Sequence, residues 1–301
     1  MRIMRVATIS IPRTGDMAAN LQRAVSSIEQ AGAAKPDIIC LPEAMCNTVR
    51  SAETVPGRLT DTFAALARKN RCHIIAPLIK KESDGKIYNV AEIIAADGSI
   101  VGEYKKMFPA DNGLRMGITP GSETKVFETP KGRIGIATCF DIHFEEVIKG
   151  LVRDGVEVVF FISAFEGGRL LQRWALDYSI YVVSAHRAGI GAVVDKSGYL
   201  LQKGDPGFQP IIIRDLNMDR EIFHLNFNWK KIEGIYAKYG NQIHIDVYRP
   251  EAIFALESRS PGLSITDLMQ EYNLEPFQAY IQRCREMCAG ARAGQTEFPY
   301  Y

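Results

Sequence analysis

Patterns of buried strands and amphipathic helices alternate along the chain almost without interruption, and this alternation restricts the fold more than any other feature. A first strand is predicted over residues 5–11, and residues 37–41 (DIICL) form an unbroken apolar run typical of a fully buried strand. Between them, Asp16 is placed to cap a helix that continues to about Ala33. A strand, a crossover helix and a second strand build parallel sheets, so the chain is predicted to be an α/β protein.

Hairpins are inserted into this order at three places. Residues 87–104 turn at Asp97-Gly98, which is a strong hairpin signal, and residues 125–138 and 193–202 repeat the pattern. Because hairpins and crossover helices occur together, we expect mixed sheets with helices outside them instead of one parallel sheet. The order of helix, strand, helix and hairpin recurs in the second half. We therefore expect a four-layer α-β-β-α sandwich of two mixed sheets, with helices on both outer faces.

The C-terminal part of the chain has a different pattern. Residues 260–287 read as two short helices, and Ser264 is a plausible cap for the first of them. Neither a Gly/Ser-rich linker nor a low-complexity stretch separates this part from the rest. We expect one domain over residues 1–259 and a helical extension over residues 260–301, which packs on the core or contacts another subunit.

Composition excludes several classes of protein. The net charge of +1 gives no indication of nucleic-acid or membrane-surface binding. The longest apolar runs, such as residues 156–162, are too short to cross a bilayer, and the first residues lack the apolar core of a signal peptide. Six scattered cysteines form no disulfide framework, and Cys284 and Cys288 have no histidine at zinc-site spacing. A cytoplasmic protein is therefore expected.

Cys139 is the first candidate for chemistry. It follows a predicted strand over residues 133–138 and precedes a helix predicted over residues 141–154. A cysteine in such a turn can direct its sulfur into a cleft while backbone amides at the helix start face the same space. Most cysteines are inert core residues, so this turn alone does not establish a nucleophile.

Glu43 and Lys106 complete a hydrolytic set with this cysteine. Glu43 lies just beyond the buried strand at 37–41, and Lys106 shares a strand face with Tyr104, so an inward tyrosine brings the lysine inward too. The carboxylate would accept the thiol proton, and the ammonium would stabilise negative charge on the attacked group and lower the pKa of the thiol. Taken singly, Glu43 could instead cap a helix and Lys106 could be solvated.

These residues lie in three short segments, which are CLPEA at 40–44, GEYKKMFP at 102–109 and GIATCFDIHFEE at 135–146. Together the three segments resemble the carbon–nitrogen hydrolase, or nitrilase, superfamily. The resemblance extends from Arg5 to about Asp215 and implies a Glu–Lys–Cys triad of Glu43, Lys106 and Cys139 in a four-layer sandwich. It also implies a covalent thioester or thioimidate intermediate, water as second substrate, and no metal or organic cofactor.

The same resemblance implies further details of the site and of the assembly. The oxyanion would lie between Lys106 and the backbone N–H of Phe140. Family members pair through the helices that follow the nucleophile and its companion strand, so a homodimer or larger homo-oligomer is expected.

Several positions depart from the family pattern and bear on the substrate. Leu114 occupies the place of a second glutamate, and residues 143–146 (HFEE) replace the common Arg-Phe-Pro-Glu. Cys139 is followed by Phe140 and Asp141 instead of the Trp-Glu typical of true nitrilases, which favours a small amide or carbamoyl substrate over a nitrile. Arg169 could bind a substrate carboxylate, although a surface arginine explains it equally well. The predicted substrate-binding residues are His143, Glu145, Phe165 and Arg169.

Other functions remain open at this point. A cysteine–histidine hydrolase is one, because His143 lies four residues after Cys139 and His186 follows a buried strand. Nitrile hydrolysis or acyl transfer to an amine would use the same triad. A non-catalytic binding or assembly protein on the same sandwich is the alternative from another class.

Overall fold

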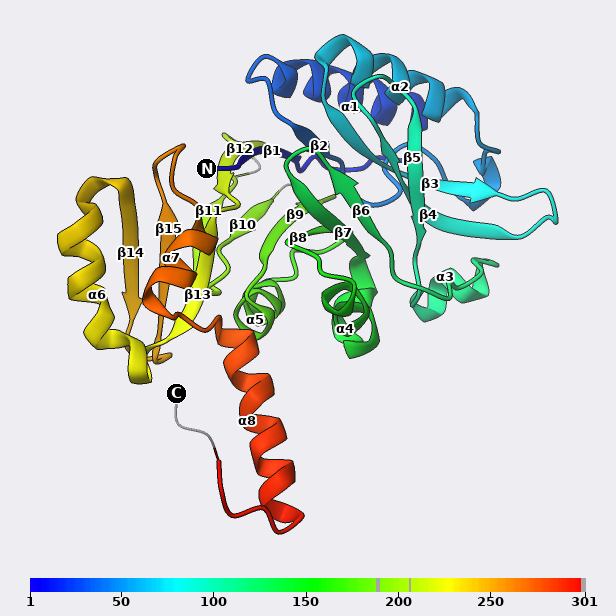
Figure 1. Cartoon of the computed structure of the whole chain (residues 1–301). Coiled ribbons are helices and arrows are strands. Elements are labelled where there is room, and N and C mark those ends of the chain that lie inside the picture. Colours follow the sequence, from blue (N-terminus) through cyan, green and yellow to red (C-terminus); the bar gives the residue numbers. More distant parts are fainter. Residues whose placement is uncertain (188–189, 206, 299–301) are drawn as a thin grey trace. The chain divides into compact units, whose positions relative to one another are not determined.

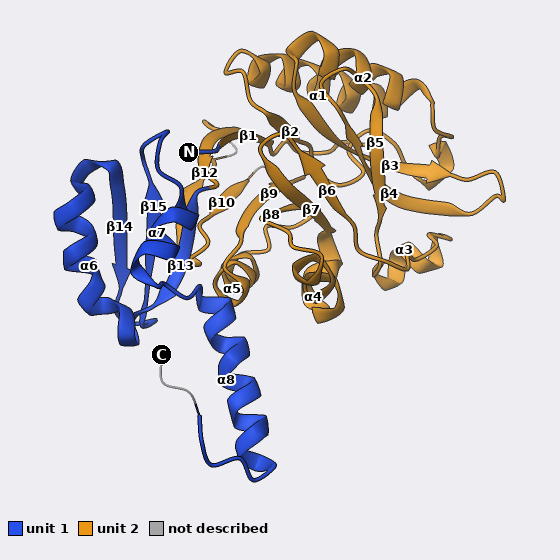
Figure 2. Ribbon diagram, in the orientation of Figure 1, with its two compact units in different colours: residues 1–2, 219–301 blue, residues 3–218 orange. Residues whose placement is uncertain are grey.

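The computed structural model describes residues 1–187, 190–205 and 207–298, and its contacts divide the chain into two compact units (Figures 1 and 2). One unit spans residues 3–218, and the other contains residues 1–2 and 219–301. The expected boundary lay after residue 259. The structure instead groups residues 219–259 with the C-terminal helices, because the strands in this segment pair with one another and share a core with those helices.

The first sheet of the larger unit has the order β12-β1-β2-β3-β4-β5. Its strands β1, β2 and β3 are parallel, and the others join antiparallel, so the sheet is mixed as expected. Helices α1 (Met17–Gly32) and α2 (Arg58–Asn70) cover its outer face (Figure 1). The strands are β1 Ile3–Ile9, β2 Ile38–Cys40, β3 His73–Lys81, β4 Ile87–Ile94, β5 Ile100–Lys105 and β12 Ile211–Asn217, and the short helices η1 Val49–Ser51 and α3 Asp111–Arg115 lie in connections.

The second sheet has the order β11-β10-β9-β8-β7-β6, with β7, β8 and β9 parallel. The helix predicted from residue 141 begins later. A 3₁₀ turn, η2 (Cys139–His143), comes first, and α4 (Glu145–Arg153) begins after Phe144. The strands of this sheet and the second helix beside it are β6 Val126–Thr129, β7 Gly132–Thr138, β8 Val158–Ser163, α5 Arg169–Tyr178, β9 Tyr181–His186, β10 Ala192–Val194 and β11 Leu200–Lys203.

Three apolar layers hold this unit together. The middle layer combines the inner faces of both sheets, with Tyr104 and Phe160 among its fully buried members. A second layer, around Phe63, lies between the first sheet and helices α1 and α2. A third, around Trp174, lies between the second sheet and helices α4 and α5. Helix, sheet, sheet and helix therefore form four layers, which confirms the predicted sandwich.

The smaller unit contains a three-stranded antiparallel sheet with the order β13-β15-β14. Ser264 caps α7 as predicted, since its hydroxyl accepts from the Asp267 N–H, while α8 is longer than the short helix expected. Of the helices in the described ranges, none has the length and apolar character needed to cross a membrane. The elements are β13 Arg220–His224, α6 Leu225–Tyr239, η3 Gly240–Gln242, β14 Ile243–Tyr248, β15 Ile253–Ser258, α7 Ile265–Tyr272 and α8 Phe277–Arg292.

Candidate active site

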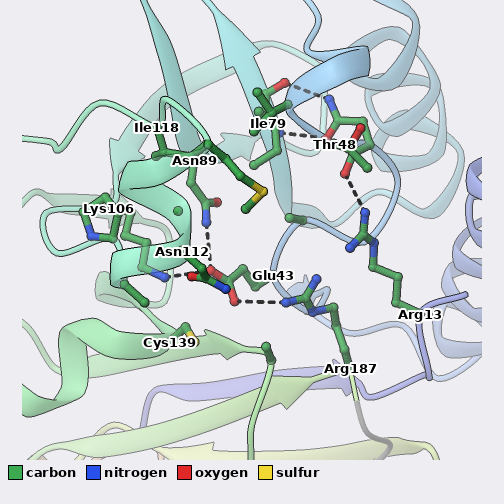
Figure 3. A pocket seen from close by; sticks show the side chains of 18 residues that line it. Arg13, Glu43, Thr48, Ile79, Asn89, Lys106, Asn112, Ile118, Cys139 and Arg187 are labelled. Carbon is green, nitrogen blue, oxygen red and sulfur yellow. Dashed lines mark hydrogen bonds and ion pairs between the residues drawn. The ribbon is translucent and has the colours of Figure 1, made fainter. Parts of the chain in front are cut away.

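Glu43, Lys106 and Cys139 line one cavity of about 320 Å³ in the larger unit (Figure 3). Lys106 directly follows β5, Cys139 directly follows β7, and Glu43 lies three residues beyond β2. The two sheets are stacked, so strand ends that are far apart in the sequence meet at this cavity. The structure thus brings together all three residues that the sequence pattern selected.

The Glu43 carboxylate is the centre of the polar contacts. Its Oε1 accepts from Lys106 Nζ and from Asn89 Nδ2, each at 2.8 Å, and Arg187 Nη2 lies 3.7 Å from its Oε2. Burial alone would raise the pKa of Glu43, but the charges of Lys106 and Arg187 and the Asn89 hydrogen bond together hold it below the ordinary value of 4.5. Glu43 is therefore an anion at neutral pH and can accept a proton.

Lys106 is the buried cation of the set. Burial by itself would lower the pKa of its ammonium group, but the carboxylate of Glu43 outweighs this and holds the pKa above its ordinary value. Tyr104 is fully buried on the same side of the chain, whereas Lys105 turns away and pairs with Glu82 at 2.8 Å. The predicted alternation of these side chains is confirmed.

Cys139 occupies a strained position between β7 and η2. Its φ of +55° lies in the left-handed region, which is uncommon for residues with a side chain. Burial raises the pKa of the thiol and the charge of Glu43 raises it further, while Lys106 and hydrogen bonds from the Ala164 N–H and the Ser163 hydroxyl lower it. Lys106 thus favours the thiolate as expected, but the raising effects prevail and the thiol is protonated at neutral pH.

Asp141 is a buried residue of this region to which the sequence analysis gave no role. One carboxylate oxygen accepts from the Tyr104 hydroxyl at 2.7 Å and from the Thr138 N–H at 2.8 Å, and the other accepts from the Phe108 N–H at 2.9 Å. These bonds connect the segment that carries Lys106 to the turn that carries Cys139. Burial raises the pKa of Asp141 to about 6. Its position two residues after the cysteine was the one available signal.

The four predicted substrate-binding residues lie outside the cavity, which corrects the expectation that they line it. The described lining of the cavity includes none of the four, which are His143, Glu145, Phe165 and Arg169. All four are exposed: the rings of His143 and Phe165 stack 6.2 Å apart, and Glu145 pairs with Lys149 along α4. The turn at Cys139 directs the sulfur inward, whereas His143, at the end of the same 3₁₀ helix, faces outward. The role of the Phe140 N–H stays a prediction.

The cavity also has polar lining residues that the sequence analysis did not select. Arg13 comes from the connection between β1 and α1, Asn47 from the segment after Glu43, and Arg187 from the end of β9. Only Arg187 had a signal, because residues 186–189 (HRAG) stand where the resembled family often has Asn-x-x-Gly. Residues 188 and 189 lie outside the described residues. Loop residues of this kind carry no periodicity, so patterns of strands and helices cannot select them.

The alternatives to the triad find less support in this geometry. His186 is buried, and its Nε2 accepts from the Ile190 N–H. Neither His186 nor His143 is among the described residues that line the cavity with Cys139. Leu114, at the place of the family's second glutamate, is 49% exposed on α3. The acidic residues near it in sequence, Glu103, Asp111 and Glu123, are not among the described residues that line the cavity. Within the described ranges, no group of three or more His, Cys, Asp and Glu side chains is arranged to hold a metal ion.

Comparison with known proteins assigns this arrangement to a family. The family model described as carbon-nitrogen hydrolase matches residues 5–221. The chain is 25% identical over 292 residues to the omega-amidase NIT2 of Mus musculus, and the match covers 87% of this chain and 100% of that protein. The omega-amidase NIT2 of Homo sapiens is also 25% identical, over 284 residues, with the same coverage.

Solved structures with the same fold agree with this match. Saccharomyces cerevisiae Nit3, a member of branch 10 of the nitrilase superfamily, has a TM-score of 0.65 at 22% identity, over 71% of this chain and 90% of that one. A carbon-nitrogen hydrolase from Helicobacter pylori G27 has a TM-score of 0.63 at 18% identity, over 78% and 92%. A double mutant of the amidase from Nesterenkonia sp. AN1, in complex with acrylamide, has a TM-score of 0.62 at 17% identity, over 71% and 90%. At these identities the similarity confirms the fold.

Proposed function

Because the chain belongs to the carbon–nitrogen hydrolase family, we propose that it hydrolyses the C–N bond of a small amide or carbamoyl compound, with Cys139 as nucleophile. The observation that carries this proposal is the 2.8 Å ion pair between Lys106 and Glu43 on the wall of the cavity that also holds Cys139. The names of the similar proteins, which are omega-amidases and an amidase, favour an amide.

The first half of the reaction forms a thioester. Glu43 accepts the proton of the Cys139 thiol as the sulfur attacks the carbonyl carbon of the amide. Negative charge then develops on the carbonyl oxygen, where the Lys106 ammonium and the backbone N–H of Phe140 stabilise it. The tetrahedral intermediate collapses as the C–N bond breaks. The leaving nitrogen takes the proton from Glu43, and ammonia or an amine departs.

The second half releases the acid. Water enters the place of the departed amine, and Glu43 accepts one of its protons as the oxygen attacks the thioester carbon. Breaking of the C–S bond returns the proton to the sulfur and yields the carboxylic acid. Glu43 is suited to both halves because its ion pair keeps it charged at neutral pH although it is buried.

Ammonia release from a panel of primary amides, carbamoyl amino acids and nitriles tests the proposal, with intact-mass measurement on the same samples. We expect turnover of at least one amide, together with an acyl adduct on the protein. The adduct and turnover are expected to be absent in Cys139→Ala, while Cys288→Ala, a control that removes an exposed cysteine on α8, retains both. Failure of a broad panel to give either ammonia or an adduct would refute the proposal.

A further inference from the structure

The two oxygens of the Glu43 carboxylate have different surroundings. Oε1 accepts from Lys106 Nζ and from Asn89 Nδ2, each at 2.8 Å (Figure 3). A carboxylate oxygen has about two lone-pair sites, so these two donors occupy both of them. No described residue donates a hydrogen bond to Oε2, because Arg187 Nη2, at 3.7 Å, is too far away for one. Oε2 is therefore the oxygen that is free to accept a proton.

Asn89 is held beside Lys106 by the sheet itself. It lies within β4, and its backbone carbonyl accepts from the Lys106 N–H at 2.9 Å. Its side chain is buried and is part of the cavity wall. An ionised carboxylate only accepts hydrogen bonds, so the atom of the Asn89 amide that faces Glu43 has to be the nitrogen. The backbone and the charge of Glu43 together fix the orientation of this amide.

This orientation leaves the other end of the Asn89 amide unsatisfied. Oδ1 is buried and has no hydrogen-bond partner among the described residues. A buried acceptor without a donor lowers stability, and an apolar side chain at this place would avoid that loss. Asn47, another buried asparagine of the cavity wall, differs, because its amide both donates to and accepts from the backbone of Ile79. The Asn47 amide supports the fold, whereas the Asn89 amide serves Glu43.

We propose that Asn89 is a positioning residue for the general base, which together with Lys106 fixes Glu43 through Oε1 and leaves Oε2 to accept the proton of Cys139. The inference rests on the proposed function, since it assigns the base of that reaction to one atom. The thiol proton moves to Oε2 while the sulfur electron pair forms the bond to the carbonyl carbon, and Oε2 later gives this proton to the leaving nitrogen. Without Asn89, one donor to Oε1 remains and the carboxylate can rotate out of this orientation.

Asn89→Leu removes the donor and keeps a side chain of similar size. We expect kcat to fall about 10- to 100-fold and KM to stay within about threefold, because the base is misplaced while the substrate contacts remain. The urea midpoint is expected to stay close to that of the wild type, since the lost hydrogen bond is offset by removal of the unsatisfied Oδ1. The matched control is Asn70→Leu, which removes an amide that donates to the Leu66 carbonyl in α2, away from the cavity. Its kcat is expected to stay within about twofold of the wild type.

The dependence on pH separates positioning of the base from a merely structural role. A hydrogen bond to an ionised carboxylate favours the ionised form, so Glu43 is protonated more easily in Asn89→Leu. We expect the ratio of variant to wild-type kcat/KM to be at least about threefold lower at pH 5 than at pH 7.5. The other charged or titratable groups that face Glu43 are the same in both proteins, and they are Lys106, Arg187, Arg13 and Cys139.

Asn89→Asp should show the opposite trend. Two adjacent carboxyl groups share one proton, and Lys106 keeps Glu43 as the ionised member of the pair. The introduced carboxyl group then donates to Oε1 as the amide does, so activity relative to the wild type is expected to rise as the pH falls from 7.5 to 5. The inference is overturned if Asn89→Leu keeps kcat within about threefold of the wild type. It is also overturned if both variants lose the same fraction of activity at every pH.

Alkylation of the cysteines separates this inference from the proposed function, because it needs no turnover. As iodoacetamide forms the S–C bond and iodide leaves, the thiol proton passes to Glu43 and then to water. Peptide mass spectrometry gives the rate for Cys139 relative to exposed Cys288 in the same molecule. We expect Asn89→Leu to lower this ratio about 10-fold. A lowered ratio without hydrolysis of any amide by the wild type would refute the function and keep the inference. Hydrolysis with an unchanged ratio would do the reverse.

Discussion

The Tyr104 hydroxyl donates a 2.7 Å hydrogen bond to the Asp141 carboxylate, and this buried pair connects the two sheets at the candidate active site. Tyr104 belongs to β5, which leads into Lys106, and Asp141 belongs to the turn that begins with Cys139. Asp141 also accepts from the backbone N–H groups of Thr138 and Phe108. One carboxylate therefore holds the turn of the proposed nucleophile against the segment of Lys106, the cation proposed to stabilise the oxyanion.

Asp141→Asn tests this positioning role. An asparagine keeps the shape but loses one acceptor oxygen, so at least one of the three donors is left without a partner. We expect a loss of about 1–3 kcal/mol in the free energy of unfolding. We also expect kcat to fall about 10- to 100-fold, because small displacements of reacting groups are costly, while KM changes little.

Tyr104→Phe serves as the graded comparison for Asp141→Asn. It removes one hydroxyl donor and leaves the two backbone bonds of Asp141 in place. Its loss of kcat should be smaller than that of Asp141→Asn. If both variants lose stability but keep the wild-type kcat, Asp141 supports the fold and does not position the site.

Lys106→Met removes the cation at the site while preserving the apolar part of the side chain. Removal of one oxyanion donor typically lowers kcat by about 10²- to 10³-fold, and we expect a loss of this size. Lys105→Met is the matched control, because this neighbour faces away from the cavity and pairs with Glu82. The control is expected to stay within about threefold of the wild-type rate. Equal losses in the two variants would refute a specific role of Lys106.

The dependence of kcat/KM on pH distinguishes a thiol deprotonated during attack from a preformed thiolate. The pKa of Glu43 is held below 4.5 and that of Cys139 is raised above 9.0. Activity requires the ionised carboxylate, so it is lost as the pH falls through the depressed pKa of Glu43. We therefore expect a level profile between about pH 7 and pH 8, a decline as Asp141 is protonated around pH 6, and further loss as the pH falls through the depressed pKa of Glu43. A rate that rises tenfold per pH unit up to pH 9 would instead identify a preformed thiolate.

The sequence predicted the four layers and the three central site residues because each leaves a periodic or positional signal. Glu43 and Cys139 follow buried apolar runs, and the face of Lys106 follows from its spacing to Tyr104. The stacking of two sheets then brings these strand ends together. Such an argument needs only the period of a strand and the order of the elements.

The remainder of the site depends on loop conformations that have no period. Arg13 reaches the cavity because Asn47, far along the chain, fixes its guanidinium. The cysteine–histidine alternative placed His143 beside Cys139 from its spacing on a helix, but the chain forms a 3₁₀ turn there and the ring faces outward. The domain boundary at Met218 was also missed, because no Gly/Ser-rich linker or other sequence signal marks the end of the sandwich there.

Glu92 is a buried carboxyl group away from the candidate site, and both of its side-chain oxygens lack hydrogen-bond partners among the described residues. It lies opposite Glu103 in the β4–β5 pair, and Lys80 pairs with Glu103 instead, at 2.8 Å. Burial, and secondarily the charge of Glu103, raise the pKa of Glu92 from 4.5 to about 7. The group is therefore unfavourable for folding once it is ionised.

Glu92→Gln should consequently make the sandwich more stable at alkaline pH. Between pH 4.5 and about 7 the folded chain binds more protons at Glu92 than the unfolded chain does, so this group lowers stability as the pH rises through that window. Glutamine has no proton to lose in this pH range. The free energy of unfolding of Glu92→Gln relative to the wild type should therefore grow from near zero at pH 4.5 to at most about 3 kcal/mol above pH 7. Urea unfolding followed by the fluorescence of buried Trp174, in a Trp229→Phe background, measures this unit alone. The control Glu123→Gln, a substitution at an exposed ion pair, should show no such trend with pH. A stability advantage of Glu92→Gln that is constant with pH would contradict the raised pKa assigned to Glu92.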